Sequence, residues 1–310
     1  MTDAFPATGR PDPAQPRFRV GSAPDSWGVW FPSDPRQTPW TRFLDEIARA
    51  GYEWLELGPY GYLPTDAGTL RAELGARGLR LAGGTVGGPL HRRAELGAIQ
   101  ARLLDVARLA AALGAGHVVF LPALYRDLSD GRPLEPAELD EDHWRALAGG
   151  AGHLARVLRD ETGMRFVFHP HAESHVETDA QIRRFLADTD PELVGLCLDT
   201  GHVAYSRGDA PRLLREHAGR IWYVHLKAVD PGVLAQVQAG RLSFAEAVKR
   251  DVMCEPGRGV PALGEVADAL GSLPPGTFVI VEQDLYPCDF DRPYPIAVRT
   301  RQTLKSAGIG

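Results

Sequence analysis

The sequence is poor in cysteine and has no excess of positive charge. Its three cysteines, Cys197, Cys254 and Cys288, form no CxxC pair and are odd in number. This usage argues against a disulfide framework and is typical of reduced thiols. Lys and Arg total 34 against 40 Asp and Glu, which gives a formal net charge of −6 at pH 7. Proteins that bind polyanions usually present a basic surface, so we expect no nucleic acid and no membrane as a partner.

Long apolar runs and a secretory leader pattern are also missing. No stretch approaches the roughly 18 continuous apolar residues that a membrane-spanning helix needs. Residues 1–19 show no basic segment followed by an apolar one, so we expect a cytoplasmic protein. Residues 1–17 contain four prolines and no periodic apolar pattern, which predicts a Pro-rich tail outside the core. We expect residues 18–310 to form one domain with a large core, since 44% of the chain is hydrophobic.

From Phe18 onward, short β-like runs alternate with longer amphipathic stretches, as in parallel strands joined by helices. Eight strands are predicted, at residues 18–23, 54–57, 79–83, 117–121, 165–169, 194–199, 221–226 and 278–282. Helices are predicted at residues 38–50, 94–113, 142–159, 178–187, 263–273 and 296–306. A doubly wound sheet usually has about five to seven strands and a nucleotide-binding loop after the first. Eight strand–helix units in about 290 residues instead predict a single-domain (β/α)8 TIM barrel.

Polar side chains stand at the ends of five predicted strands, where a TIM barrel holds its active site. Burying them is costly unless they are paired or bound to a metal. Four of them end the last four strands and converge near the barrel axis: His169, Asp199, His225 and Glu282. Two imidazoles and two carboxylates suit Mn²⁺, Co²⁺, Fe²⁺ or Zn²⁺ and leave coordination positions open for a substrate. A single histidine at a strand end is more often structural, so the prediction rests on the set of four.

Six motifs together carry a family resemblance over about Phe18 to Ser306. They are APDSWG (23–28), GYEWLELGPYGYLP (51–64), FHPH (168–171), LDTGH (198–202), HLK (225–227) and VEQD (281–284). This combination resembles the sugar phosphate isomerase/epimerase superfamily, and within it most of all the inosose dehydratases of inositol catabolism. The resemblance implies a xylose isomerase-like TIM barrel, a small polyhydroxylated ketone as substrate, and a divalent metal, Mn²⁺ or Co²⁺ before Zn²⁺ or Fe²⁺.

The resemblance also implies a set of metal ligands. Members of the superfamily usually hold the metal with Glu, Asp, His and Glu at the ends of strands five to eight. Asp199, His225 and Glu282 match that pattern, whereas His169 stands where many relatives have Glu. The fourth ligand is therefore His169, with Glu173 or a water molecule as the alternative.

The inosose dehydratase reaction removes a proton next to a ketone and expels hydroxide from the following carbon. The enediolate that forms needs a Lewis acid, and the proton transfers suit imidazoles, whose pKa lies near 7. Under this hypothesis His171 and His202 are base and acid, with Glu173 as an alternative and Lys227 beside the oxyanion. His202 has a second interpretation, as a residue that orients the Asp199 loop.

Four further residues are expected to contact the substrate. Glu56 ends the second predicted strand and can hydrogen-bond ring hydroxyls. Trp27 and Tyr60 belong to an aromatic group that forms either a wall against a sugar ring or part of the core. Arg258 lies in EPGRGVP (255–261), which resembles a loop that precedes the last helix in this superfamily and lies near the substrate; a plain turn is the alternative.

Other functions on the same scaffold stay open. Ketose epimerases and isomerases form the same enediolate but return the proton, and lyases of 3-keto-glycosides expel an alcohol or an aryl carbon. FHPH in place of a Glu-containing strand end favours the dehydratase or lyase branch. A non-catalytic sugar-binding barrel is a further alternative. A net charge of −6 and ligands for one metal argue against abasic-site endonucleases. The chain is either a monomer or a homo-oligomer.

Overall fold

The computed structural model describes residues 17–128 and 130–310. The tail predicted at residues 1–17 therefore lies, except for Arg17, outside the described residues. Within the described ranges, no helix combines the length and apolar character that crossing a membrane requires.

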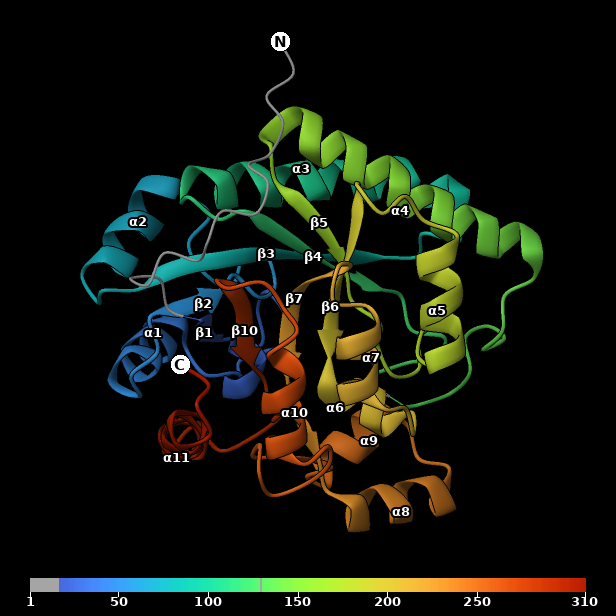
Figure 1. The fold of residues 1–310 in the computed structure, drawn as a ribbon. Helices are drawn as coiled ribbons and strands as arrows, with labels where there is room; N and C mark the ends of the chain where they lie inside the picture. The colour runs from blue at the N-terminus through green and yellow to red at the C-terminus, as the bar shows by residue number, and fades with distance from the viewer. Residues whose placement is uncertain (1–16, 129) are drawn as a thin grey trace.

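Eight parallel strands close into a barrel, which confirms the predicted TIM barrel (Figure 1). In order around the barrel they are β1 (Phe18–Ser22), β2 (Trp54–Glu56), β3 (Arg80–Gly88), β4 (His117–Pro122), β5 (Arg165–Phe168), β6 (Val194–Asp199), β7 (Ile221–Leu226) and β10 (Thr277–Val281). The last strand closes the barrel by pairing with β1 on one side and β7 on the other. All eight predicted strands are present, and β3 runs five residues beyond its predicted end, to Gly88 rather than residue 83.

The six predicted helices are present with shifted ends: α1 (Trp40–Arg49), α3 (Leu96–Ala112), α4 (Glu141–Thr162), α5 (Asp179–Ala187), α10 (Leu263–Leu270) and α11 (Pro293–Ser306). The prediction missed several shorter elements. These are α2 (Ala67–Gly75), α6 (Thr200–Tyr205), α7 (Ala210–Glu216), α8 (Pro231–Gly240), α9 (Phe244–Lys249), the 3-10 turns η1 (Pro24–Trp27) and η2 (Arg93–Glu95), and a small antiparallel pair of β8 (Ala228–Val229) and β9 (Met253–Cys254).

Local signals set the ends of the predicted helices. The Asp140 side chain accepts the His143 amide hydrogen at the start of α4, and Gly163 ends that helix with a φ of 71°. At the start of α5, Thr178 and Gln181 form a capping box. These caps direct each helix back along the outside of the barrel.

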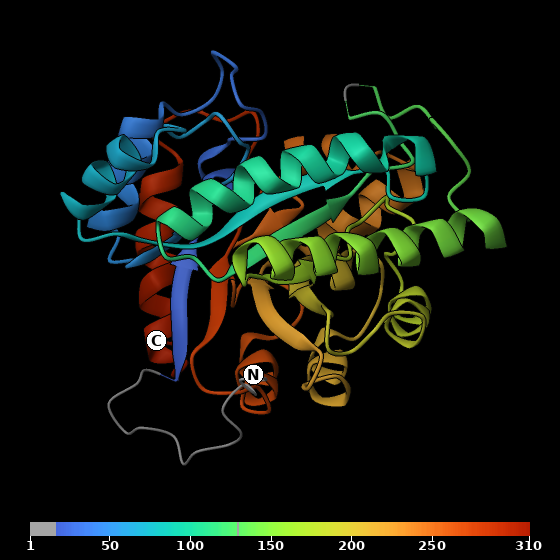
Figure 2. The ribbon, with the colours of Figure 1, turned by 90° about the horizontal axis from the view of Figure 1, so that it is seen from above.

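The helices pack tightly against the strands. Figures 1 and 2 both show α3 and α4 side by side over β3, β4 and β5. A Cβ atom at Gly84 of β3 would lie 2.5 Å from Cγ1 of Val106 on α3, so only glycine permits this approach. Inside the barrel, a layer of buried side chains fills the space below the carboxyl ends of the strands: Ala82, Val119, Val167, Cys197, Tyr223, Phe278 and Ile280. The polar strand ends therefore stand on a rigid apolar floor.

Candidate active site

A cavity of about 640 Å³ opens at the carboxyl ends of the barrel strands. Its floor is polar and includes Asp25, Glu56, His169, His171, His202, His225, Lys227, Glu282 and Asp284. Its walls are mostly apolar and include Val29, Trp30, Tyr60, Val86, Leu121, Leu124, Leu128 and Phe244. The cavity thus combines a cluster of ionisable groups with surfaces that suit a carbon skeleton.

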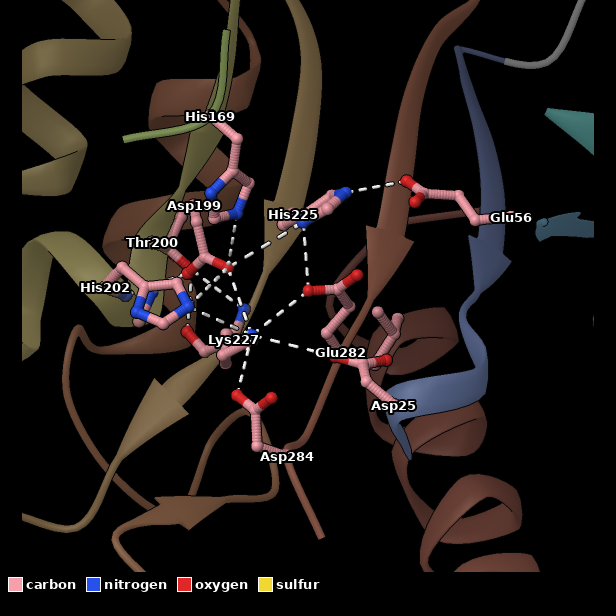
Figure 3. Close-up of polar contacts among 12 residues, drawn as sticks. Asp25, Glu56, His169, Asp199, Thr200, His202, His225, Lys227, Glu282 and Asp284 are labelled. Atoms are coloured by element: carbon pink, nitrogen blue, oxygen red, sulfur yellow. Dashed lines mark hydrogen bonds and ion pairs between the residues drawn. The ribbon is translucent and has the colours of Figure 1, made fainter. Parts of the chain in front are cut away.

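Three of these floor residues and Asp199, the last residue of β6, bring one ligand atom each within 4.8 Å of one another: His169, Asp199, His225 and Glu282. All four side chains are buried. Nδ1 of His225 lies 2.9 Å from Oε2 of Glu282, and Nε2 of His169 lies 3.4 Å from Oδ2 of Asp199 (Figure 3). Together they are the set predicted to bind a metal, and we call them the barrel-end cluster.

Two of these side chains, Asp199 and His225, are oriented by a hydrogen bond to a residue outside the cluster. Asp199 caps α6, because its Oδ1 accepts hydrogen bonds from the amides of Gly201 and His202 at 2.7 and 2.8 Å. Its Oδ2 then faces the cluster. On β7, Nε2 of His225 lies 2.7 Å from Oε1 of Glu56, which fixes the ring and turns Nδ1 inward.

Three buried polar atoms of the cluster make no hydrogen bond of good geometry among the described residues: Nδ1 of His169, Oδ2 of Asp199 and Nδ1 of His225. Two of them make ion-pair contacts instead, Oδ2 of Asp199 with Lys227 at 3.3 Å and Nδ1 of His225 with Glu282 at 2.9 Å. Two imidazoles and two carboxylates in such close contact fit a borderline divalent ion. The residues present therefore fit the metal that the family resemblance implies.

Lys227 supplies the positive charge of the site. Its Nζ lies 2.8 Å from Asp284, 3.1 Å from Glu282 and 3.3 Å from Asp199 (Figure 3). Burial alone would lower the pKa of Lys227, but these carboxylates raise it well above its usual value. Burial would likewise raise the pKa of Glu282, but His225 and Lys227 bring it down to about 2. Thr200 holds Lys227 in place by exchanging two hydrogen bonds with its backbone.

His171 and His202 lie side by side over the cluster, with ring centroids 3.8 Å apart. The backbone of Ala172 contacts both rings. Nδ1 of His171 lies 2.7 Å from the carbonyl oxygen of Ala172, whereas Nδ1 of His202 lies 3.4 Å from its amide nitrogen. The Ala172 carbonyl places the ring hydrogen of His171 on Nδ1. Nδ1 of His202 faces the Ala172 amide, and its Nε2 lies 3.4 Å from Nζ of Lys227. Burial, with His169, lowers the pKa of His171 to about 3.

Three expected contacts require correction. Trp27 is fully buried below the cavity, where its Nε1 donates to Glu46 at 2.9 Å, because the η1 turn carries it away from the opening. Glu173 has a φ of 60° and is buried outside the cavity lining, where its carboxylate accepts from Arg126 and from the Phe244 amide. It therefore neither contacts the His171–His202 pair nor replaces His169.

Arg258 also lies outside the cavity lining. Its side chain is 71% exposed and pairs with Glu255. The loop 255–261 precedes α10, and the last helix is α11, so the expected position of this loop was wrong. Tyr60 lines the cavity as expected. Glu56 lines it too, but its oxygens contact His225 and the Thr85 hydroxyl, so it positions a ligand candidate.

The sequence interpretation overlooked Asp25, Asp284 and Phe244. Asp25 and Asp284 contact Lys227, and both stand inside motifs already quoted, APDSWG and VEQD. A carboxylate three residues after a strand end was the available signal. Phe244 comes from the insertion after β7 and packs edge-on against His171, with centroids 5.2 Å apart. Its position depends on the unpredicted helices α8 and α9.

Comparison with known proteins places the chain in a family. The family model described as xylose isomerase-like TIM barrel matches residues 44–304. The chain belongs to this family. The rhizopine catabolism protein MocC of Rhizobium meliloti is 35% identical over 257 residues, covering 81% of this chain and 76% of that protein. Inosose dehydratase of Geobacillus kaustophilus (strain HTA426) is 32% identical over 292 residues, covering 93% and 94%.

Solved structures of the family share the fold at low identity. IolI, crystallised with a zinc atom bound, superposes with a TM-score of 0.71 at 14% identity and covers 94% of this chain and 98% of that one. The probable 3-DHS dehydratase AsbF from Bacillus anthracis gives a TM-score of 0.70 at 14% identity, covering 93% and 99%. The family model confirms the expected xylose isomerase-like family, and these structures share its barrel fold.

Proposed function

We propose that this protein is a metal-dependent dehydratase of a keto-cyclitol such as 2-keto-myo-inositol. The observation that carries the proposal is the buried barrel-end cluster, whose four ligand atoms lie within 4.8 Å of one another beside the stacked rings of His171 and His202. Relatives named inosose dehydratase, at about 30% identity over nearly the whole chain, support the same reaction class.

Mn²⁺ or Co²⁺ is the proposed metal, with His169, Asp199, His225 and Glu282 as its ligands. A divalent ion there would act as a Lewis acid and make the proton next to the ketone more acidic. Zn²⁺ and Fe²⁺ suit the same donors and are the alternatives. Glu56 holds the His225 ring in its ligating orientation.

The two histidines divide the proton transfers between them. With its hydrogen on Nδ1 directed at the Ala172 carbonyl, His171 presents the Nε2 lone pair and accepts the proton next to the ketone. His202, stacked on His171, is the proposed acid. As an imidazolium it gives one proton to the departing hydroxyl, which leaves as water, and its ring returns to neutral imidazole. Lys227, held charged by its carboxylate partners, stabilises the negative oxygen that develops in between.

The walls of the cavity favour a second candidate, a lyase of 3-keto-glycosides. A volume of about 640 Å³ falls within the range of roughly 300–1,000 Å³ that drug-sized ligands occupy. A single six-carbon ring leaves much of that space empty. Trp30, Leu128 and Phe244 would contact an apolar group attached to the ring.

One experiment separates these functions. Metal-stripped protein receives Mn²⁺ or Co²⁺ and is mixed with 2-keto-myo-inositol in deuterated water, while NMR follows the products. Loss of a hydroxyl with metal, and none without it, is the expected result. Exchange with retention of every hydroxyl would identify an epimerase. If the cyclitol is inert but an aryl 3-keto-glucoside is cleaved, the lyase replaces the dehydratase.

A further inference from the structure

A second group of side chains of the types that ligate metals lies outside the cavity lining, on the rim of the barrel. It consists of His91, Glu135 and His175, which come from the loops after β3, β4 and β5. His91 and His175 are 3% and 2% exposed, and their ring centroids are 4.6 Å apart. Nε2 of His91 lies 3.1 Å and Nε2 of His175 lies 3.0 Å from Oε1 of Glu135. We call these residues the rim cluster.

A neutral His175 ring cannot donate to both of the acceptors that its two nitrogens face. Its Nδ1 lies 3.0 Å from the carbonyl oxygen of Ala137, and its Nε2 lies 3.0 Å from the Glu135 carboxylate. Both partners are acceptors, but a neutral imidazole has one N–H. With the hydrogen on Nδ1, the Nε2 lone pair points at a carboxylate oxygen. A positive charge is needed between them, either a second proton or a metal ion.

The surroundings of Glu135 favour the metal ion. Nε2 of His91 lies 3.1 Å from each oxygen of Glu135, so one ion beside this carboxylate serves both rings at once. Arg92 contacts Oε2 at 2.9 Å, and His175 contacts Oε1.

We propose that the rim cluster binds a divalent cation, with Zn²⁺ as the preferred ion. The ligands are Nε2 of His91, Nε2 of His175 and Oε1 of Glu135. Two imidazoles and one carboxylate are a common zinc donor set, and bonds of about 2.0–2.2 Å place tetrahedral ligand atoms roughly 3.3 Å apart. The observed separations of 3.0 and 3.1 Å are within a few tenths of an ångström of that value. The Ala137 carbonyl holds the Nδ1 hydrogen of His175, as outer partners of zinc-bound histidines do.

An ion at this site would join three loops at the mouth of the cavity. The loop after β4 carries Glu135 and also Leu124 and Leu128, which line the cavity wall. A metal ion that holds Glu135 in place would therefore also restrict the motion of Leu124 and Leu128 in the cavity wall. The rim cluster lies outside the cavity lining, so its role is structural, and the proposal is independent of the reaction assigned to the barrel-end cluster.

Zinc binding by purified variants tests the proposal. His225→Ala first removes the barrel-end cluster as a binding site. This variant, stripped of metal and titrated with Zn²⁺ alone, is expected to bind one equivalent and to gain thermal stability as Zn²⁺ rises. Adding His175→Gln is expected to lower the Zn²⁺ affinity at least about tenfold and to abolish the gain. Adding His143→Gln instead is the matched control, because His143 is an exposed rim histidine outside the cluster.

A second, more conservative variant tests the site in case His175→Gln disturbs the fold. Glu135→Gln keeps the shape of the side chain and removes the charge, and it is expected to weaken Zn²⁺ binding in the same background. Co²⁺ in place of Zn²⁺ gives a visible absorption band that reports coordination by the rim cluster. The proposal is overturned if His225→Ala binds no Zn²⁺, or if its affinity is the same with and without His175→Gln and Glu135→Gln.

Discussion

Both ends of the barrel hold charged side chains, but the contacts that stabilise these charges differ between the two ends. At the carboxyl end, Asp199, Glu282 and Asp284 surround the ammonium group of Lys227, and Nδ1 of His169 has no hydrogen-bond partner among the described residues. At the amino end, Arg19 lies over the rings of Trp54 and Phe278, and Arg165 lies over Trp222.

This difference suggests that the carboxyl end serves the reaction and that the amino end serves the stability of the fold. Cations stacked on aromatic faces are satisfied without any further ligand. Buried carboxylates and imidazoles with free lone pairs are satisfied only by something that binds. We therefore expect substitutions at the carboxyl end to change metal content and activity, and substitutions at the amino end to change the free energy of unfolding.

The largest expected effect comes from His225→Ala. Removing one ligand of the barrel-end cluster should release the metal there and lower kcat/KM at least about 10³-fold, because Lewis-acid stabilisation is worth several kcal/mol. The barrel should stay folded, since the apolar layer below is untouched. Metal analysis and circular dichroism check this. Wild-type activity in the variant, or in chelator-treated protein, would refute the ligand set.

His171→Gln tests the proposed base without removing a ligand. We expect kcat to fall about 10²- to 10⁴-fold, the usual contribution of a positioned base. Metal content and KM should change little, because the substitution leaves the barrel-end cluster intact. The exposed His143→Gln serves as the control and should retain full activity. Equal loss of kcat in both variants would show that His171 is not the base.

Much of this end of the barrel was predictable from sequence because strand ends place side chains by a simple rule. The strands carrying Asp199 and His225 are continuous apolar runs, so their last residues had to converge. Trp27 and Trp30 stand three residues apart, and only the η1 turn decides which one reaches the cavity. Glu173 lies outside the cavity lining and has a positive φ that its sequence does not signal.

The insertion after β7 and the rim cluster could not be predicted from the sequence, for a different reason. Helices α8 and α9 contain ten and six residues and pack as a separate apolar cluster that supplies Phe244 to the cavity. His91, Glu135 and His175 come from three loops whose approach depends on the closed barrel. The sequence of one loop does not indicate which residues of other loops it will contact in the folded protein.

At the amino end, His117 should make stability depend on pH. Burial, with Arg165 and Arg19, lowers the pKa of His117 to about 4. Because the unfolded chain has a pKa near 6.5, it binds the proton more readily than the folded chain below that pH. The contribution of His117 is fully present above pH 6.5 and is lost as pH falls toward 4, by about 3 kcal/mol at most. Chemical unfolding of wild type and His117→Asn at several pH values measures the difference, which should shrink toward acid pH. A difference that is constant with pH would contradict the prediction.

The smallest expected effect is that of Arg19→Gln, which removes one stacked cation. The guanidinium carbon of Arg19 lies 5.5 Å from the centre of the Trp54 ring and 5.3 Å from that of Phe278. A half-exposed contact of this kind contributes about 0.5–1 kcal/mol, so chemical unfolding should show a loss of that size. Arg19→Lys keeps the charge and should recover part of it. Metal content and kcat should equal those of the wild type in both variants, because the apolar layer separates Arg19 from the barrel-end cluster. A drop in activity without a drop in stability would mean that the two ends of the barrel are coupled through that layer.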